Sequence, residues 1–156
     1  MKYSLRQHLI KEEQQVMSPA RAFVQDIGNQ ADRFVQDYDA EITLIDGDCM
    51  TTLYLEIPSE QESPSYAHIG YIEVTNKDGK ADPNCFRKGY ASSMMRLVAD
   101  GADKHNVTLG LSAESPTGYY REVTYGTMDV PDNDELARFY SKFGFVETNR
   151  NPEQIY

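Results

Sequence analysis

The sequence predicts an α/β fold built as one domain. Stretches with the period-2 alternation of a strand, such as 67–75, are followed by stretches with helical spacing, such as 89–106. A length of 156 residues suits a single domain (1–156) with one hydrophobic core, and no internal repeat or linker divides the chain. The composition, 40% hydrophobic and 26% charged residues, is typical of a soluble globular protein.

The N-terminal third predicts a strand followed by helical structure. Residues 2–10 form a short mixed run that indicates a first strand. Ser18 and Pro19 predict a helix start, with serine as N-cap and proline in the first turn. Helical spacing of apolar residues continues to about Asp39, and Gly28 is a place where the helix could divide in two.

A hairpin and a further strand come next. The ranges 40–45 and 50–57 predict two strands, joined by the turn signal of Asp46 and Gly47. A polar loop follows at 58–65, and 67–75 predicts the next strand. In that strand one face should carry Ile69, Tyr71, Glu73 and Thr75, and the other Gly70, Ile72 and Val74.

The C-terminal half predicts alternating helices and strands. After a polar loop at 76–84, a helix runs from Gly89 to about His105, with Asn106 as a left-handed cap and His105 near the helix end. A strand is expected at 107–113. The aromatic alternation within 115–130 indicates an extra strand or hairpin. Asp132 and Glu135 form a capping box for the last helix, Gly144 should close it, and a short strand should begin at Phe145.

The stretch from Asn84 to Val98 indicates an anion site. A small-residue loop leads from a strand into a helix N-terminus, where backbone N–H groups converge and the helix dipole adds partial positive charge. Gly89 would let the backbone approach a ligand closely. The segment 76–96 carries a net charge of +3 and the rest of the chain −13, within a total of −10. A basic region at this loop suits a polyanionic cofactor.

Two motifs resemble the GNAT (general N-acetyltransferase) superfamily. The frame Phe86-Arg87-Lys88-Gly89-Tyr90-Ala91 resembles the family's pyrophosphate loop, Gln/Arg-x-x-Gly-x-Gly/Ala, although Phe86 departs from the first position. The spacing of Asn133, Tyr140 and Gly144-Phe145 resembles the C-terminal motif of the family. The resemblance covers roughly residues 66 to 148. It implies a GNAT-like mixed, mostly antiparallel curved sheet with helices on both faces and a central splayed pair of parallel strands, 67–75 and 107–113.

The resemblance also implies acetyl transfer from acetyl-coenzyme A to a primary amine by direct attack in a ternary complex. Tyr140 matches the tyrosine that protonates or stabilises the coenzyme A sulfur, although it could also be a core aromatic. Glu73 and Glu114, at the ends of the two strands, are rival general bases, and each could otherwise be a solvated carboxylate at a strand end. A carboxylate is needed because an aliphatic amine with a pKa of about 10.4 is almost wholly protonated at pH 7.

Cofactor contacts are expected from the loop, the strand and the last helix. Val74 resembles the residue whose backbone N–H meets the thioester carbonyl, and Ile72 is expected to contact the cofactor beside it. Asn133 would contact the pantetheine arm or serve as a first-turn helix residue. Arg87 and Lys88 would contact the diphosphate or remain solvated charges. The remaining expected contacts are Phe86, Gly89, Tyr90, Ala91 and Ser92.

The charge and the few cysteines and histidines limit the other functions. A net charge of −10 argues against nucleic-acid binding and favours a cationic amine acceptor. No apolar run or signal-like N-terminus suggests a membrane, and Cys49 and Cys85 suggest reduced thiols in a cytoplasmic protein, although a disulfide between them stays open. The histidines have no metal-ligand spacing, so no metal is expected. A homodimer is compatible with this interpretation. The rival interpretation is a catalytically inactive GNAT-like protein whose acidic surface binds a basic partner.

Overall fold

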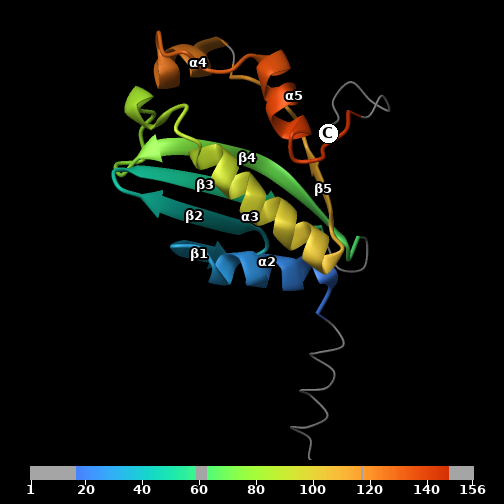
Figure 1. Cartoon of the computed structure of the whole chain (residues 1–156). Helices are drawn as coiled ribbons and strands as arrows, with labels where there is room; N and C mark the ends of the chain where they lie inside the picture. The colour runs from blue at the N-terminus through green and yellow to red at the C-terminus, as the bar shows by residue number, and fades with distance from the viewer. Residues whose placement is uncertain (1–16, 59–62, 117, 148–156) are drawn as a thin grey trace, which may run out of the picture.

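A computed structural model describes residues 17–58, 63–116 and 118–147 of the chain. Within them, no helix combines the length and the apolar character needed to cross a membrane. Figure 1 shows the elements, which follow in the order α2 (Pro19–Asn29), β1 (Arg33–Gln36), β2 (Ala40–Asp46), β3 (Cys49–Glu56), β4 (Tyr66–Asn76), the 3-10 helix η1 (Pro83–Cys85), α3 (Tyr90–His105), β5 (Thr108–Leu111), α4 (Gly118–Tyr125) and α5 (Asn133–Ser141).

The strands form one five-stranded mixed sheet with the order β1-β2-β3-β4-β5. The first four strands are antiparallel neighbours, and β4 and β5 are parallel. The predicted turn at Gly47 is confirmed, since it has a left-handed φ of 59° and connects Asp46 to its ladder partner Cys49. The parallel pair lies at an edge of the described sheet, whereas the GNAT resemblance implied a central position.

Helices α2 and α3 cover one face of the sheet, as Figure 1 shows. Alternate residues of β3 are buried, which places Leu53 and Leu55 against the helices. Phe23 of α2 and Met94 of α3 belong to the same core cluster. The predicted helix signals hold in the structure: the Ser18 side chain caps α2, and the capping box of α5 is present. Asn106 ends α3 in the left-handed conformation.

A β-bulge at Gly70 divides β4 into two parts. Tyr54 pairs with Tyr71 but the next residue, Leu55, pairs with Ile69, so Gly70 is extra on β4. Ile69 therefore lies on the same face as Ile72, and the predicted alternation through this strand was wrong at Ile69. The pairing of β4 with β5 ends at Ile69 and Leu111. Beyond the bulge, the remaining part of β4 has no β5 partner in the described sheet.

The helix expected up to Asp39 ends at Asn29, and β1 follows it. Gly28 is the cause, because a Cβ at this position would collide with the ring of Phe34. The glycine lets the chain turn back so that Phe34 packs on α2 while pairing with Ile42 of β2. The tertiary contact overrides the helical spacing of the sequence.

Two predictions in the C-terminal part were also wrong. The region 115–130 contains helix α4 instead of a strand or hairpin, and residues 145–147 form no strand. A strand needs a neighbour for its backbone groups, whereas a helix satisfies them within the segment. The strand expected at 2–10 lies outside the described residues.

Cys49 and Cys85 form a disulfide, with Cα atoms 5.7 Å apart. The prediction of reduced thiols is therefore wrong, and the argument for a cytoplasmic protein loses this support, because disulfides are typical of oxidising compartments. The bond joins the start of β3 to η1. It therefore anchors the segment that leads directly into the predicted phosphate loop.

Candidate functional site

The loop before α3 has the backbone geometry of an anion site. Gly89 is the N-cap of α3 with a left-handed φ of 83°, and Arg87 is also left-handed, with a φ of 57°. The N–H groups in the first turn of a helix have no intrahelical acceptor, so those of Tyr90 to Ser92 remain available. A Cβ placed on Gly89 would meet nothing within 4 Å. The loop is therefore open at the point where a phosphate would approach.

The two cations of the loop differ in their surroundings. The Arg87 guanidinium donates to Asp129 at 2.8 Å and lies 3.9 Å from Glu135. These carboxylates belong to the α4–α5 connection and to α5, so Arg87 holds the loop against the start of α5. Lys88 is exposed, with no partner in the described part of the chain. Exposed ion pairs contribute only about 0–1 kcal/mol, so a ligand phosphate could compete for Arg87.

Asn133 links the start of α5 to the end of β5. Its amide oxygen accepts a hydrogen bond of 2.6 Å from the backbone N–H of Ser115. Ser115 follows Glu114, so the structure brings the predicted pantetheine contact and one predicted base close together. The side chain of Asn133 thus has a structural partner in this structure.

Ile72 and Val74 lie on the part of β4 beyond its last β5 partner. Their β3 partners are Leu53 and Thr51, which places both side chains on the helix-covered face. On the other edge of this part of β4, the backbone has no strand partner within the described residues. An unpaired strand edge presents N–H and C=O groups that can bind an extended ligand.

Tyr140 is almost completely buried, with 7% of its surface exposed. Its ring centroid lies 5.1 Å from that of Phe139 and 6.0 Å from that of Phe145. Its hydroxyl has no hydrogen-bond partner among the described residues, and no fully enclosed side-chain oxygen there lacks one, so the hydroxyl reaches the surface. Burial raises the pKa of Tyr140 to about 12, which keeps it protonated at neutral pH. Tyr140 follows Asn133 by seven positions, so both lie on one face of α5.

Glu73 lies in a tyrosine-rich, partly buried environment. Burial is the main cause that raises the pKa of Glu73, and the charge of Glu41 on β2 adds to it. Helix α4 also lies near Glu73. The charge of Glu73 helps to raise the pKa of Tyr125 on α4, which reaches about 12 mainly through burial. A general base works best when its pKa is nearer neutrality than that of an ordinary carboxylate, and the raised pKa of Glu73 goes in that direction.

Glu114 is exposed on the loop after β5. The two candidate bases follow the ends of the β4–β5 pairing, Glu73 after Ile69 and Glu114 after Leu111. They therefore both follow the point at which the pairing of the two strands ends.

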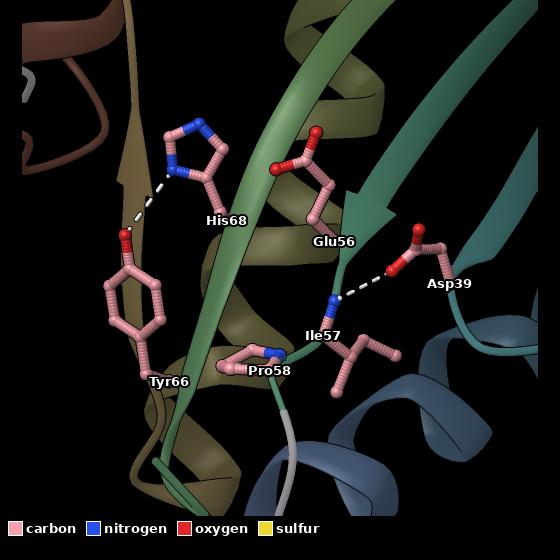
Figure 2. Close-up of a pocket in the computed structure, with 6 residues that line it drawn as sticks. All are labelled: Asp39, Glu56, Ile57, Pro58, Tyr66 and His68. Atoms are coloured by element: carbon pink, nitrogen blue, oxygen red, sulfur yellow. Dashed lines mark hydrogen bonds between the residues drawn. The ribbon is translucent and has the colours of Figure 1, made fainter. Parts of the chain in front are cut away.

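A pocket of about 330 Å³ on the other face of the sheet was not predicted from the sequence. Figure 2 shows it with α3 behind the strands. Asp39 accepts hydrogen bonds from the Tyr54 hydroxyl at 2.7 Å and from the Ile57 N–H at 3.1 Å. The Tyr66 hydroxyl lies 3.3 Å from Nδ1 of His68. The pocket is lined by Asp39, Glu56, Ile57, Pro58, Tyr66 and His68.

The alternation of β3 could have indicated part of this pocket, because it places Glu56 outside the core. The position of His68 in the pocket could not be predicted, because the bulge at Gly70 interrupts the alternation and counting back from Tyr71 gives the wrong face. The ladder pairs His68 with Glu56. Among the described residues, no group of three or more histidine, cysteine, aspartate or glutamate side chains is arranged to hold a metal ion.

Comparison of the chain with protein-family models, curated proteins and solved structures finds no match.

Proposed function

We propose that this chain is a GNAT-like N-acetyltransferase that moves an acetyl group from acetyl-coenzyme A to a primary amine by direct attack in a ternary complex. The observation that carries the proposal is that β5 ends at Leu111 while β4 continues beyond the Gly70 bulge. It leaves an unpaired edge on β4 beyond Ile69. The loop with the left-handed Gly89 follows β4 and opens α3. An elongated ligand with a diphosphate at one end and amide groups along its length suits such an arrangement.

The coenzyme A thioester would supply the activated acetyl group. The residues 86–92 would bind the diphosphate through backbone N–H groups and the charges of Arg87 and Lys88. Ile72 and Val74 would present their backbone to the thioester and its arm, with Asn133 on the α5 side. A polyanion would replace Asp129 as the partner of Arg87, an exchange between exposed groups that costs little.

The reaction would need a base for the amine and an acid for the leaving sulfur. Glu73 or Glu114 would take the proton of the ammonium group, and the nitrogen would form the new amide bond as the carbon–sulfur bond breaks. The protonated Tyr140 would give its proton to the departing thiolate, and the second proton that the nitrogen loses as the amide forms would restore Tyr140 through solvent. The raised pKa of Glu73 supports its assignment as the base over the exposed Glu114.

A second candidate is a GNAT-like binding protein without catalysis. The contacts that favour it are those in which predicted cofactor residues already have protein partners: Arg87 with Asp129, and Asn133 with Ser115. In this alternative the acidic surface, with a charge of −13 outside residues 76–96, would bind a basic partner.

The proposal is tested by two measurements on the full chain. Calorimetry should show acetyl-coenzyme A binding, and release of coenzyme A thiol should be detected with some members of a panel of primary amines. Both cysteines are in the disulfide, so the protein itself gives little background with a thiol reagent under non-reducing conditions. Binding without turnover on any amine favours the second candidate, and absence of binding contradicts the proposal.

A further inference from the structure

The sheet face opposite α2 and α3 carries carboxylates at two places with tyrosines between them. At one end is the pocket of Figure 2, with Asp39 and Glu56. Toward the other end, Glu41 and Glu73 are close enough for the charge of Glu41 to raise the pKa of Glu73. We call this face, from Glu56 to Glu73, the acidic strip.

The middle of the acidic strip is aromatic. Tyr54 and Tyr71 are cross-strand partners, and their rings are stacked with centroids 5.3 Å apart and planes 3° from parallel. Two glycines make this surface possible. A Cβ on Gly70 would lie 2.9 Å from the Tyr54 ring and 3.3 Å from Oε1 of Glu56. A Cβ on Gly110 would collide with the hydroxyl of Tyr66, so Tyr66 lies directly over the β5 backbone.

The spacing of the two acidic ends follows from the register. Glu73 pairs with Thr52, which is four residues from Glu56 along β3. At about 3.4 Å per residue the two ends are roughly 14 Å apart. Glu41 pairs with Tyr54, midway between them. Glu56, Glu41 and Glu73 therefore follow one another along the strip at intervals of about two strand residues.

The groups on the acidic strip determine the chemistry of its ligand. The strip offers carboxylate acceptors and aromatic rings, and no lysine or arginine stands at these positions of β3 and β4. The backbone groups of β3 are used by the ladders on both sides, so an extended peptide would find few partners for its carbonyls. Ammonium groups donate only, and they bind both carboxylates and tyrosine faces. Methylene groups can lie on the rings.

We propose that the acidic strip binds a linear aliphatic polyamine, with one ammonium group at Asp39 and Glu56, another between Glu41 and Glu73, and the methylene chain against Tyr54 and Tyr71. Binding at the strip is independent of acetyl transfer. That the bound polyamine is also the acetyl acceptor rests on the proposed function, because Glu73 is the candidate base at the end of the strip.

The test uses calorimetry on the full chain without coenzyme A, with spermidine as the triamine and butylamine as the monoamine. Spermidine should bind at least about tenfold more tightly, because a second ammonium group binds with a high effective concentration once the first is held. Glu56→Gln and Glu41→Gln should each weaken spermidine about two- to fivefold, the size expected for exposed ion pairs. Tyr71→Phe should retain the affinity and Tyr71→Leu should lose about two- to fivefold, since the ring face carries the contact.

Asp100→Asn is the matched control, because it removes one negative charge from an exposed position on α3, on the opposite face of the sheet. It should leave spermidine binding unchanged. Equal affinities for spermidine and butylamine, or equal effects of Asp100→Asn and Glu56→Gln, overturn the proposal. Spermidine that binds the strip but is not acetylated when acetyl-coenzyme A is added supports the strip and contradicts the acceptor assignment. Turnover of other amines with no spermidine binding contradicts the strip and leaves the proposed function standing.

Discussion

Tyr140 combines almost complete burial with a hydroxyl that no described residue binds. Tyr140→Phe keeps the ring contacts with Phe139 and Phe145 and removes only the hydroxyl. If Tyr140 protonates the leaving sulfur, kcat should fall by about 10²–10⁴-fold, the usual contribution of a positioned acid. Steady-state kinetics with the best amine of the panel measures the change.

The thermal stability and the acetyl-coenzyme A affinity of Tyr140→Phe should match those of the parent, because the lost hydroxyl has no partner among the residues that the structure describes. Tyr38→Phe is the matched control, since Tyr38 is 87% exposed. A Tyr140→Phe protein that turns over as fast as the parent would show that Tyr140 is only a core aromatic.

Glu73 gives a prediction about pH. Burial and the charge of Glu41 raise the pKa of Glu73. Glu41→Gln removes that charge, so the pKa of Glu73 should fall and the rise of kcat/KM with pH should move to lower pH. A pH–rate profile that is the same in the parent, in Glu41→Gln and in Glu73→Gln would assign the base to Glu114 or to another group.

The same raised pKa affects stability. A carboxyl whose pKa is higher in the folded state favours folding at low pH, and this contribution is lost as pH rises through the folded pKa. Glu73→Gln should therefore raise the melting temperature at pH 7 relative to the parent, and raise it less at pH 4. Such a gain at neutral pH is typical of functional residues whose ionised form is held at a cost to stability.

At the scale of elements, the loop before α3 can be tested with two glycines of similar geometry. Gly89 has a φ of 83° and Gly79 a φ of 77°, and a Cβ on either would meet nothing within 4 Å. Gly89→Ala and Gly79→Ala should therefore lose similar stability, about 1–2 kcal/mol for a left-handed alanine. Only Gly89→Ala should weaken acetyl-coenzyme A, because its methyl group would occupy the space of the diphosphate. Equal affinities of the two variants by calorimetry would place the diphosphate elsewhere.

The elements that could be predicted from the sequence are those whose signals are local. The hairpin turn at Gly47, the capping box of Asp132 and the helix from Gly89 depend on residues next to one another in the chain. Those that could not be predicted depend on distant residues. Gly28 ends α2 because Phe34 packs over it. The alternation within 115–130 forms α4, since a strand there would need a neighbour that a local pattern does not reveal.

The same distinction applies to the site. The phosphate-like loop and the α5 motif are contiguous in sequence, so their residues could be predicted. The pairing of Arg87 with Asp129 spans 42 positions and left no sequence signal. The pocket at Asp39 and Glu56 depends on the hairpin register and on the Gly70 bulge, both of which appear only when strands are paired.

At the scale of the whole molecule, the Cys49–Cys85 disulfide joins parts of the chain that are 36 residues apart. Constraint of a loop of this length in the unfolded chain stabilises the fold by roughly 3–4 kcal/mol. It also fixes η1, which leads into the loop at Gly89. We expect reduction to lower the midpoint of chemical denaturation and to weaken acetyl-coenzyme A binding. Denaturant titrations and calorimetry, with and without reductant, measure both effects.

The control for this prediction is the double variant Cys49→Ala/Cys85→Ala. It should have the lower stability of the reduced protein and should not respond to reductant, because it has no other cysteine. A loss of acetyl-coenzyme A affinity with the fold still intact would show that the disulfide orders the loop as well as stabilising the molecule. Two titratable thiols in the untreated native protein, together with a denaturation midpoint that reductant does not change, would contradict the prediction.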